Sequence, residues 1–173
     1  MTGFFQTYFD ILESIDDSLK KERIVPGLIL FYSAIDSFSR LAENTNRTGK
    51  KVFKDWVKKW MLDKHPLPCN ETDIYSARCG LLHQQISESD LTTDRKAKEI
   101  FYAWGNSDVK LLQDTIDNSD KKDKGVAVKI EDLVWAFRQA MADCMDEINK
   151  DKQWRQNFDE KAKKLFVSVR HSV

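Results

Sequence analysis

Long amphipathic stretches with very little glycine or proline constrain the fold of this chain most strongly. Apolar residues recur at steps of three and four between Phe4 and Leu19, and again between Leu133 and Ile148. This spacing places them on one face of an α-helix. The 173 residues include only 6 glycines and 3 prolines, and turn residues do not recur at short, regular intervals. The pattern predicts long helices that pack together through their apolar faces.

The first half of the chain is expected to form four helices, over about residues 4–23, 26–43, 50–62 and 74–87. Pro26 suits the first turn of the second helix, where a missing backbone N–H group costs nothing. Pro66 and Pro68 prevent the third helix from continuing. Thr72 or Asp73 is suited to cap the fourth helix.

Residues 97–130 differ in character from the rest. The segments EIFYAWG (99–105) and GVAVKI (125–130) have the composition of short strands, and a polar segment rich in Asp, Asn and Lys separates them. A small antiparallel hairpin or sheet edge is expected here. A long helix from about Glu131 and one further helix, or a continuation of it, complete the chain. The sequence thus predicts one mainly α domain over residues 1–173, a helical bundle with a small β-hairpin insertion at 97–130.

Composition narrows the classes of function. The 28 basic and 28 acidic side chains cancel, so a dedicated duplex-DNA binder is not expected, and any contact with nucleic acid must come from a local patch. An odd set of three cysteines, Cys69, Cys79 and Cys144, favours a reducing, cytoplasmic environment. The N-terminal segment lacks the pattern of a signal peptide, and no run of about 20 apolar residues is present. No membrane partner is expected.

Arg78 occupies an unusual position in the fourth helix. On a helical wheel, Ile74 and Leu82 fall within about 60° of it on either side, so Arg78 lies at the centre of the apolar face. A buried charge without a partner costs several kcal/mol. The guanidinium group therefore needs an anion, which is a carboxylate of this chain, a carboxylate of a second chain or the phosphate of a ligand.

Two interpretations of Arg78 remain open from the residues alone. In the first, a nearby carboxylate such as Asp36 or Asp73 pairs with Arg78, and the pair only fixes how two helices cross. In the second, Arg78 contributes to a functional pocket. Cys79 and His83 lie along one flank of the same apolar face, so the histidine is placed to share such a pocket.

The spacing Arg78-x4-His83 within a helix resembles the signature of the HEPN superfamily. The preceding segment ILFYSAIDSFSRLA (29–42) is similar to the second helix of bacterial HEPN proteins. The resemblance covers about residues 4–87 and the long helix from Glu131. It implies a helical bundle that forms a homodimer in which the two R-x4-H helices meet across a twofold axis. It also implies a metal-independent endoribonuclease acting in defence or in a toxin–antitoxin system.

The resemblance also implies a role for each residue and a set of partners. His83 is the general base toward a ribose 2′-OH or the general acid toward the leaving oxygen, and Arg78 holds the scissile phosphate. Asp36 and Cys79 support them. RNA is the expected substrate, an antitoxin or other protein the expected partner, and no cofactor is needed. Active members usually carry Asn, Asp or His where this chain has Cys79, so a non-catalytic HEPN-like module that binds RNA, nucleotide or protein is the alternative.

A lysine face on the third helix is a candidate for RNA binding. Lys50, Lys54 and Lys58 recur every four residues and therefore line up on one side, opposite the apolar face. Such a row can follow a phosphate backbone, although many charged helix faces are merely solvated.

Cysteine and histidine spacing allows two other chemistries. His65, Cys69, Cys79 and His83 include an i, i+4 pair that is able to chelate zinc, but the sequence lacks a C-x2-C knuckle. Cys79 beside His83 also permits a thiolate nucleophile, for which no third, orienting residue is apparent. No P-loop, Rossmann glycine pattern or H-E-x-x-H motif occurs. The expected site contains no metal.

Overall fold

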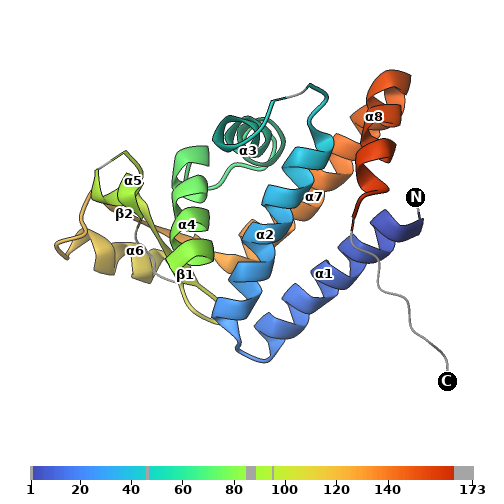
Figure 1. The fold of residues 1–173 in the computed structure, drawn as a ribbon. Helices are drawn as coiled ribbons and strands as arrows, with labels where there is room; N and C mark the ends of the chain where they lie inside the picture. The colour runs from blue at the N-terminus through green and yellow to red at the C-terminus, as the bar shows by residue number, and fades with distance from the viewer. Residues whose placement is uncertain (1, 46, 85–88, 95, 166–173) are drawn as a thin grey trace.

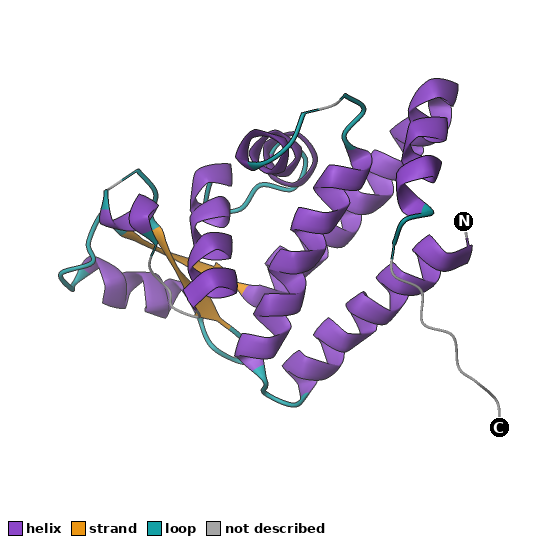
Figure 2. Ribbon diagram, in the orientation of Figure 1, coloured by secondary structure: helices purple, strands orange, loops and turns teal. Residues whose placement is uncertain are grey.

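The computed structural model describes residues 2–45, 47–84, 89–94 and 96–165, which form a mainly helical domain with a two-stranded sheet (Figures 1 and 2). Helix α3 continues without a break into the π-helix η1. The helices are α1 (Thr2–Lys20), α2 (Ile24–Ala42), α3 (Lys50–Trp56), η1 (Val57–Leu62), α4 (Glu71–Gln84), α5 (Asp90–Thr93), α6 (Val109–Asp117), α7 (Ile130–Lys150) and α8 (Lys152–Ala162). The strands are β1 (Glu99–Ala103) and β2 (Gly125–Lys129).

Helix α2 is the centre of the bundle and contacts α1, α3, α4, α7 and α8. Its Phe38 is fully buried and lies within aromatic contact of Phe4, Trp56, Phe137 and Phe158, which come from four other elements. Large aromatic side chains bury much apolar area and pack edge to face, as these do. The helices expected from the apolar spacing are confirmed within the described residues, and their apolar faces form one continuous core. The expected end of the fourth helix, residues 85–87, lies outside the described part of the chain.

By length and composition α2 would also be able to cross a membrane. Half of the relevant window is buried inside the protein, and core helices commonly pass the same test. Its packing against five other helices accounts for the apolar composition.

The cap of α4 differs from the prediction. Asn70, rather than Thr72 or Asp73, precedes the helix, and its Oδ1 accepts hydrogen bonds from the N–H groups of Thr72 (2.8 Å) and Asp73 (3.0 Å). The Asp73 carboxylate in turn accepts one from the N–H group of Asn70 at 2.9 Å. This reciprocal arrangement satisfies N–H groups that have no partner within the helix.

The two strands are parallel, so the prediction of an antiparallel hairpin at 97–130 was wrong. Glu99 pairs with Gly125, and Ala103 with Lys129. Parallel strands need a long crossover connection. Residues 104–124, which include helix α6, supply it. The expected loop forms this helix because Asp108 caps it, accepting a hydrogen bond from the N–H group of Lys110 at 2.8 Å. The insertion is therefore a β1–α6–β2 unit.

Two partly buried hydrogen bonds fix the β1–α6–β2 unit against the bundle beside α4. The Asp73 carboxylate accepts a hydrogen bond from the N–H group of Lys98 at 2.7 Å, just before β1. The hydroxyl groups of Tyr32 on α2 and Tyr102 on β1 lie 2.6 Å apart. Unpaired buried polar groups are costly, so these hydrogen bonds set the position of β1 relative to α4.

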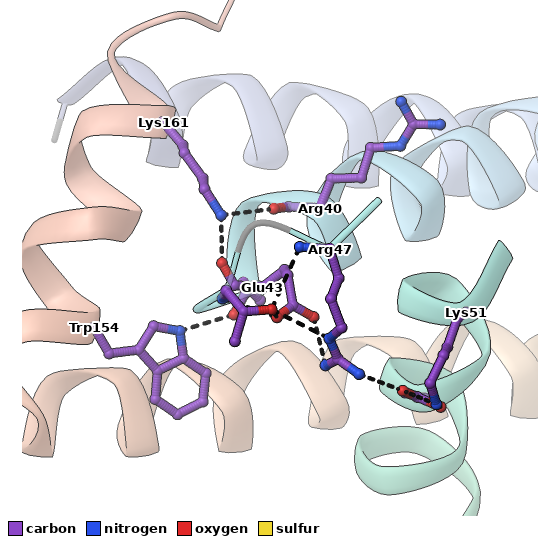
Figure 3. Close-up of polar contacts among 9 residues, drawn as sticks. Arg40, Glu43, Arg47, Lys51, Trp154 and Lys161 are labelled. Atoms are coloured by element: carbon purple, nitrogen blue, oxygen red, sulfur yellow. Dashed lines mark hydrogen bonds and ion pairs between the residues drawn. The ribbon is translucent and has the colours of Figure 1, made fainter. Parts of the chain in front are cut away.

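Helix α8 covers the C-terminal end of α2 (Figure 3). The indole Nε1 of Trp154 donates to the Ala42 carbonyl at 2.8 Å, and Lys161 donates to the carbonyls of Arg40 and Glu43. These bonds supply donors to carbonyl groups at the end of α2 that have no hydrogen-bond partner within the helix. Burial lowers the pKa of Lys161, although Glu43 opposes the shift.

Candidate functional site

Arg78 lies in the middle of α4 and faces α2, with its side chain only 13% exposed. Its Nη2 atom lies 3.1 Å from Oδ2 of Asp36 on α2. The structure thus supplies the expected counter-charge from within the chain and selects Asp36 from the two carboxylates considered. Asp73, the other one, is buried and accepts hydrogen bonds from the backbone at the start of α4 and before β1.

Asp36 does not belong to Arg78 alone. Arg40, one turn further along α2, also places its Nη2 atom 3.1 Å from Oδ2 of Asp36, and its side chain is 60% exposed. Among the side chains that the structure describes, two guanidinium groups therefore share one carboxylate next to solvent. Burial would lower the pKa of Arg78, but Asp36 and Cys79 together raise it above its usual value, so the charge is permanent.

Tyr75 and Cys79 extend this cluster along α4. Nη1 of Arg78 lies 4.0 Å from the Cys79 sulfur. Burial raises the pKa of the Tyr75 hydroxyl, and the nearby Cys79 thiol raises it further, whereas Arg78 lowers it. The Lys50 ammonium group lies over the Tyr75 ring, 5.3 Å from its centre, in a cation–π contact. Tyr75 therefore interacts with Arg78 and Cys79 on one side and with Lys50 of α3 on the other.

The three lysines predicted to bind RNA line one shallow hollow of about 370 Å³, together with Lys51, Asp55 and Glu71. Their charges are partly compensated within the chain. Lys54 lies 3.7 Å from Glu71, and Lys58 lies 2.7 Å from Asp63. The hollow still has four lysines against two carboxylates, so a positive excess remains.

His83 belongs to α4, but its side chain lies outside the described part of the structure. Its backbone follows Arg78 by five residues, which is about 7.5 Å along the helix axis. The structure therefore brings together Arg78, Asp36, Cys79 and the lysine face, and leaves the position of the imidazole open.

The residues of the zinc alternative have other neighbours. His65 lies 3.4 Å from Asp143 and contacts the Trp135 ring. Cys69 is buried, and burial raises the pKa of its thiol to about 12. Among the side chains that the structure describes, no three of His, Cys, Asp or Glu gather closely enough to hold a metal ion.

Comparisons with protein-family models, with curated proteins and with solved structures found no match to this chain. Two members of the site were not foreseen from the sequence, Arg40 and Tyr75. Arg40 was open to detection, because it follows Asp36 by four residues and therefore lies on the same side of α2. Tyr75 gave no such signal, since its spacing matched that of an ordinary core residue.

Proposed function

We propose that this protein is a cytoplasmic, homodimeric HEPN-like endoribonuclease that needs no metal ion and acts in defence or in a toxin–antitoxin system. The observation that carries the proposal is the cluster at the middle of α4. There Arg78 is nearly buried on the helix that also bears His83, and it shares one carboxylate with Arg40. Two guanidinium groups that converge on one carboxylate also offer donors to a phosphate group.

The residues have distinct roles in the proposed reaction. His83 accepts the proton of a ribose 2′-OH, whose oxygen attacks the neighbouring phosphorus while the bond to the 5′ oxygen breaks. A histidine, from this chain or its dimer mate, returns a proton to the leaving oxygen. Arg78 and Arg40 stabilise the charge that builds on the phosphate oxygens. The products are a cyclic phosphate and a 5′-hydroxyl end.

A second candidate is a non-catalytic HEPN-like module that binds RNA, nucleotide or a protein partner such as an antitoxin. The 3.1 Å ion pair between Arg78 and Asp36 favours it, because the guanidinium group already has an anion within the chain. Cys79, which replaces the polar residue of active HEPN enzymes, favours it as well.

Cleavage of a mixed RNA pool in EDTA separates the two candidates. The wild-type protein is expected to cleave, and His83→Ala to be slower by about 10²–10⁴-fold, the usual contribution of a general acid or base. His65→Ala is the matched control, because His65 lies beside Asp143 and Trp135 of α7, and it is expected to cleave normally.

Arg78→Ala is expected to abolish cleavage while the protein still melts cooperatively. Absence of cleavage by the wild-type protein on every RNA tested, or normal cleavage by His83→Ala, would exclude the enzyme.

A further inference from the structure

Charge is separated along the molecule even though the chain is neutral overall. Helix α1 carries four carboxylates against one lysine, and α7 carries five carboxylates against two basic residues. The continuous helix of α3 and η1 shows the opposite balance, with five lysines against one aspartate. A polyanion would therefore be attracted to the α3 side of the molecule and repelled from the side formed by α1 and α7.

A second basic hollow, of about 450 Å³, lies on the other side of α4 from the α3 hollow. Its walls come from the segment before β1, the turn before β2 and the start of α4, and include the lysines Lys96, Lys98, Lys122 and Lys124. The carboxylates among its lining residues are Asp73 and Asp123. Asp73 is buried, and backbone N–H groups of the fold donate two hydrogen bonds to its carboxylate, so this carboxylate is not exposed to a ligand in the hollow.

The lysines of this second hollow are more available than those on α3. Lys98 and Lys122 are exposed, and within the described residues neither forms an ion pair. Lys96 pairs with Asp94, and Lys124 donates to the carbonyl of Asp120. The hollow therefore presents ammonium groups on flexible stems around a concave surface, which suits a phosphate rather than a planar carboxylate.

The two basic hollows meet at the first turn of α4. Glu71 lines the α3 hollow, and the adjacent Asn70 lines the second one. Figure 1 shows α4 between α3 on one side and the β1–α6–β2 unit on the other, in agreement with the contacts that α4 makes to α3 and β1. A chain of phosphates that occupied both hollows would cross this turn.

We propose that the hollow formed by Lys96, Lys98, Lys122 and Lys124 binds the phosphate backbone of single-stranded RNA, and that one strand occupies it together with the α3 hollow. The choice of RNA rests on the proposed function. The β1–α6–β2 unit is then the second half of the RNA-binding surface. The lysines contact phosphates and no base edges, so binding depends on charge and is insensitive to sequence.

The test uses a fluorescently labelled oligouridylate of about 20 nucleotides, long enough to span more than one site of this size. Binding is measured in EDTA with His83→Ala as the parent, so that no cleavage occurs. The four lysines are replaced together by glutamine. We expect affinity to fall by about tenfold or more. The slope of log K against log salt should decrease by about 0.7 for each phosphate that the variant no longer neutralises.

The matched control replaces four other lysines by glutamine, Lys20, Lys152, Lys163 and Lys164, which lie at exposed positions on or near α1 and α8. This control has the same change in net charge and is expected to bind nearly as the parent does. Equal weakening in both quadruple variants would show a general charge effect and overturn the inference.

Other outcomes separate this inference from the proposed function. If glutamine at Lys50, Lys54 and Lys58 weakens binding but the new quadruple variant does not, the second hollow is excluded and the proposed function stands. If the parent does not bind the oligouridylate although the wild-type protein cleaves RNA, the inference again fails alone. Absence of both binding and cleavage overturns both.

Discussion

At the scale of single residues, Asp36 on α2 and Glu43 just after it each form ion pairs with arginine. Asp36 contacts two arginines, and these two guanidinium groups are the basis of the proposed phosphate site. Glu43, just after the end of α2, is only 8% exposed in its side chain and pairs with Arg47 at 2.9 Å (Figure 3). The hydroxyl and N–H groups of Thr45 also donate to it.

Glu43 predicts a pH-dependent contribution to stability. Burial raises the pKa of this carboxyl, but the bonds from Thr45 and Arg47 outweigh it and hold the pKa below the usual 4.5. The ionised form is therefore stabilised by folding, an effect fully present above pH 4.5 and lost as the pH falls through the lower folded value. Glu43→Gln is expected to lose about 1 kcal/mol or less at neutral pH, because the Arg47 side chain is 46% exposed and solvent screens the pair from that side.

Urea unfolding of Glu43→Gln and the wild type between about pH 3 and pH 7 measures this effect. The difference in free energy of unfolding should shrink as the pH falls below about 4.5. Glu13→Gln, at an exposed position on α1, is the control for the loss of one surface carboxylate. A difference that stays constant with pH would contradict the assignment.

At the scale of elements, the β1–α6–β2 unit depends on a close approach at Gly125. A Cβ atom at this position would lie 2.8 Å from Cγ2 of Ile116 on α6 and 2.8 Å from Cε2 of Phe101 on β1. Real Cβ atoms do not approach carbon atoms so closely. Glycine at the start of β2 therefore lets α6 and β1 pack together.

Gly125→Ala is expected to lower the free energy of unfolding by about 1–3 kcal/mol, the usual cost of overpacking. Thermal or urea denaturation measures it. Gly27→Ala is the matched control, since its Cβ would lie 3.2 Å from the end of the flexible Leu19 side chain and 3.4 Å from Cβ of Ser18, and alanine favours the helix. Gly125→Ala with wild-type stability would show that the three segments are not packed in this way.

At the scale of the whole molecule, the proposed function requires two copies that meet along α4. Cys79 is a sensitive reporter of this contact, because it is partly exposed beside Arg78 while Cys69 and Cys144 are buried. Light scattering is expected to give twice the mass of one chain. Mild oxidation is expected to produce a disulfide-linked dimer if the two Cys79 Cα atoms approach within about 7 Å.

Cys79→Ser is the control and should keep the dimer mass while losing the cross-link. A chain that remains monomeric at every concentration used in the cleavage assay would contradict the homodimer. Cleavage of RNA by such a monomer would show that the reaction does not need the dimer.

The sequence by itself determined the helices of the bundle and the charge at their faces. A repeat of apolar residues every three or four positions is a local property, so the extents of α1, α2, α3 with η1, and α7 followed from it. The same spacing placed Arg78 on an apolar face and required an anion for it. It also aligned Lys50, Lys54 and Lys58 on one side of the continuous helix formed by α3 and η1.

Only the tertiary structure decided how the pieces meet. Two short strands look alike in sequence whether they pair parallel or antiparallel, and the choice depends on whether the connection folds as a crossover helix, as α6 does. The selection of Asp36 over Asp73, the sharing of Asp36 with Arg40 and the meeting of two lysine hollows at α4 arise between segments far apart in the chain. No local periodicity encodes such contacts, because they depend on how the helices cross.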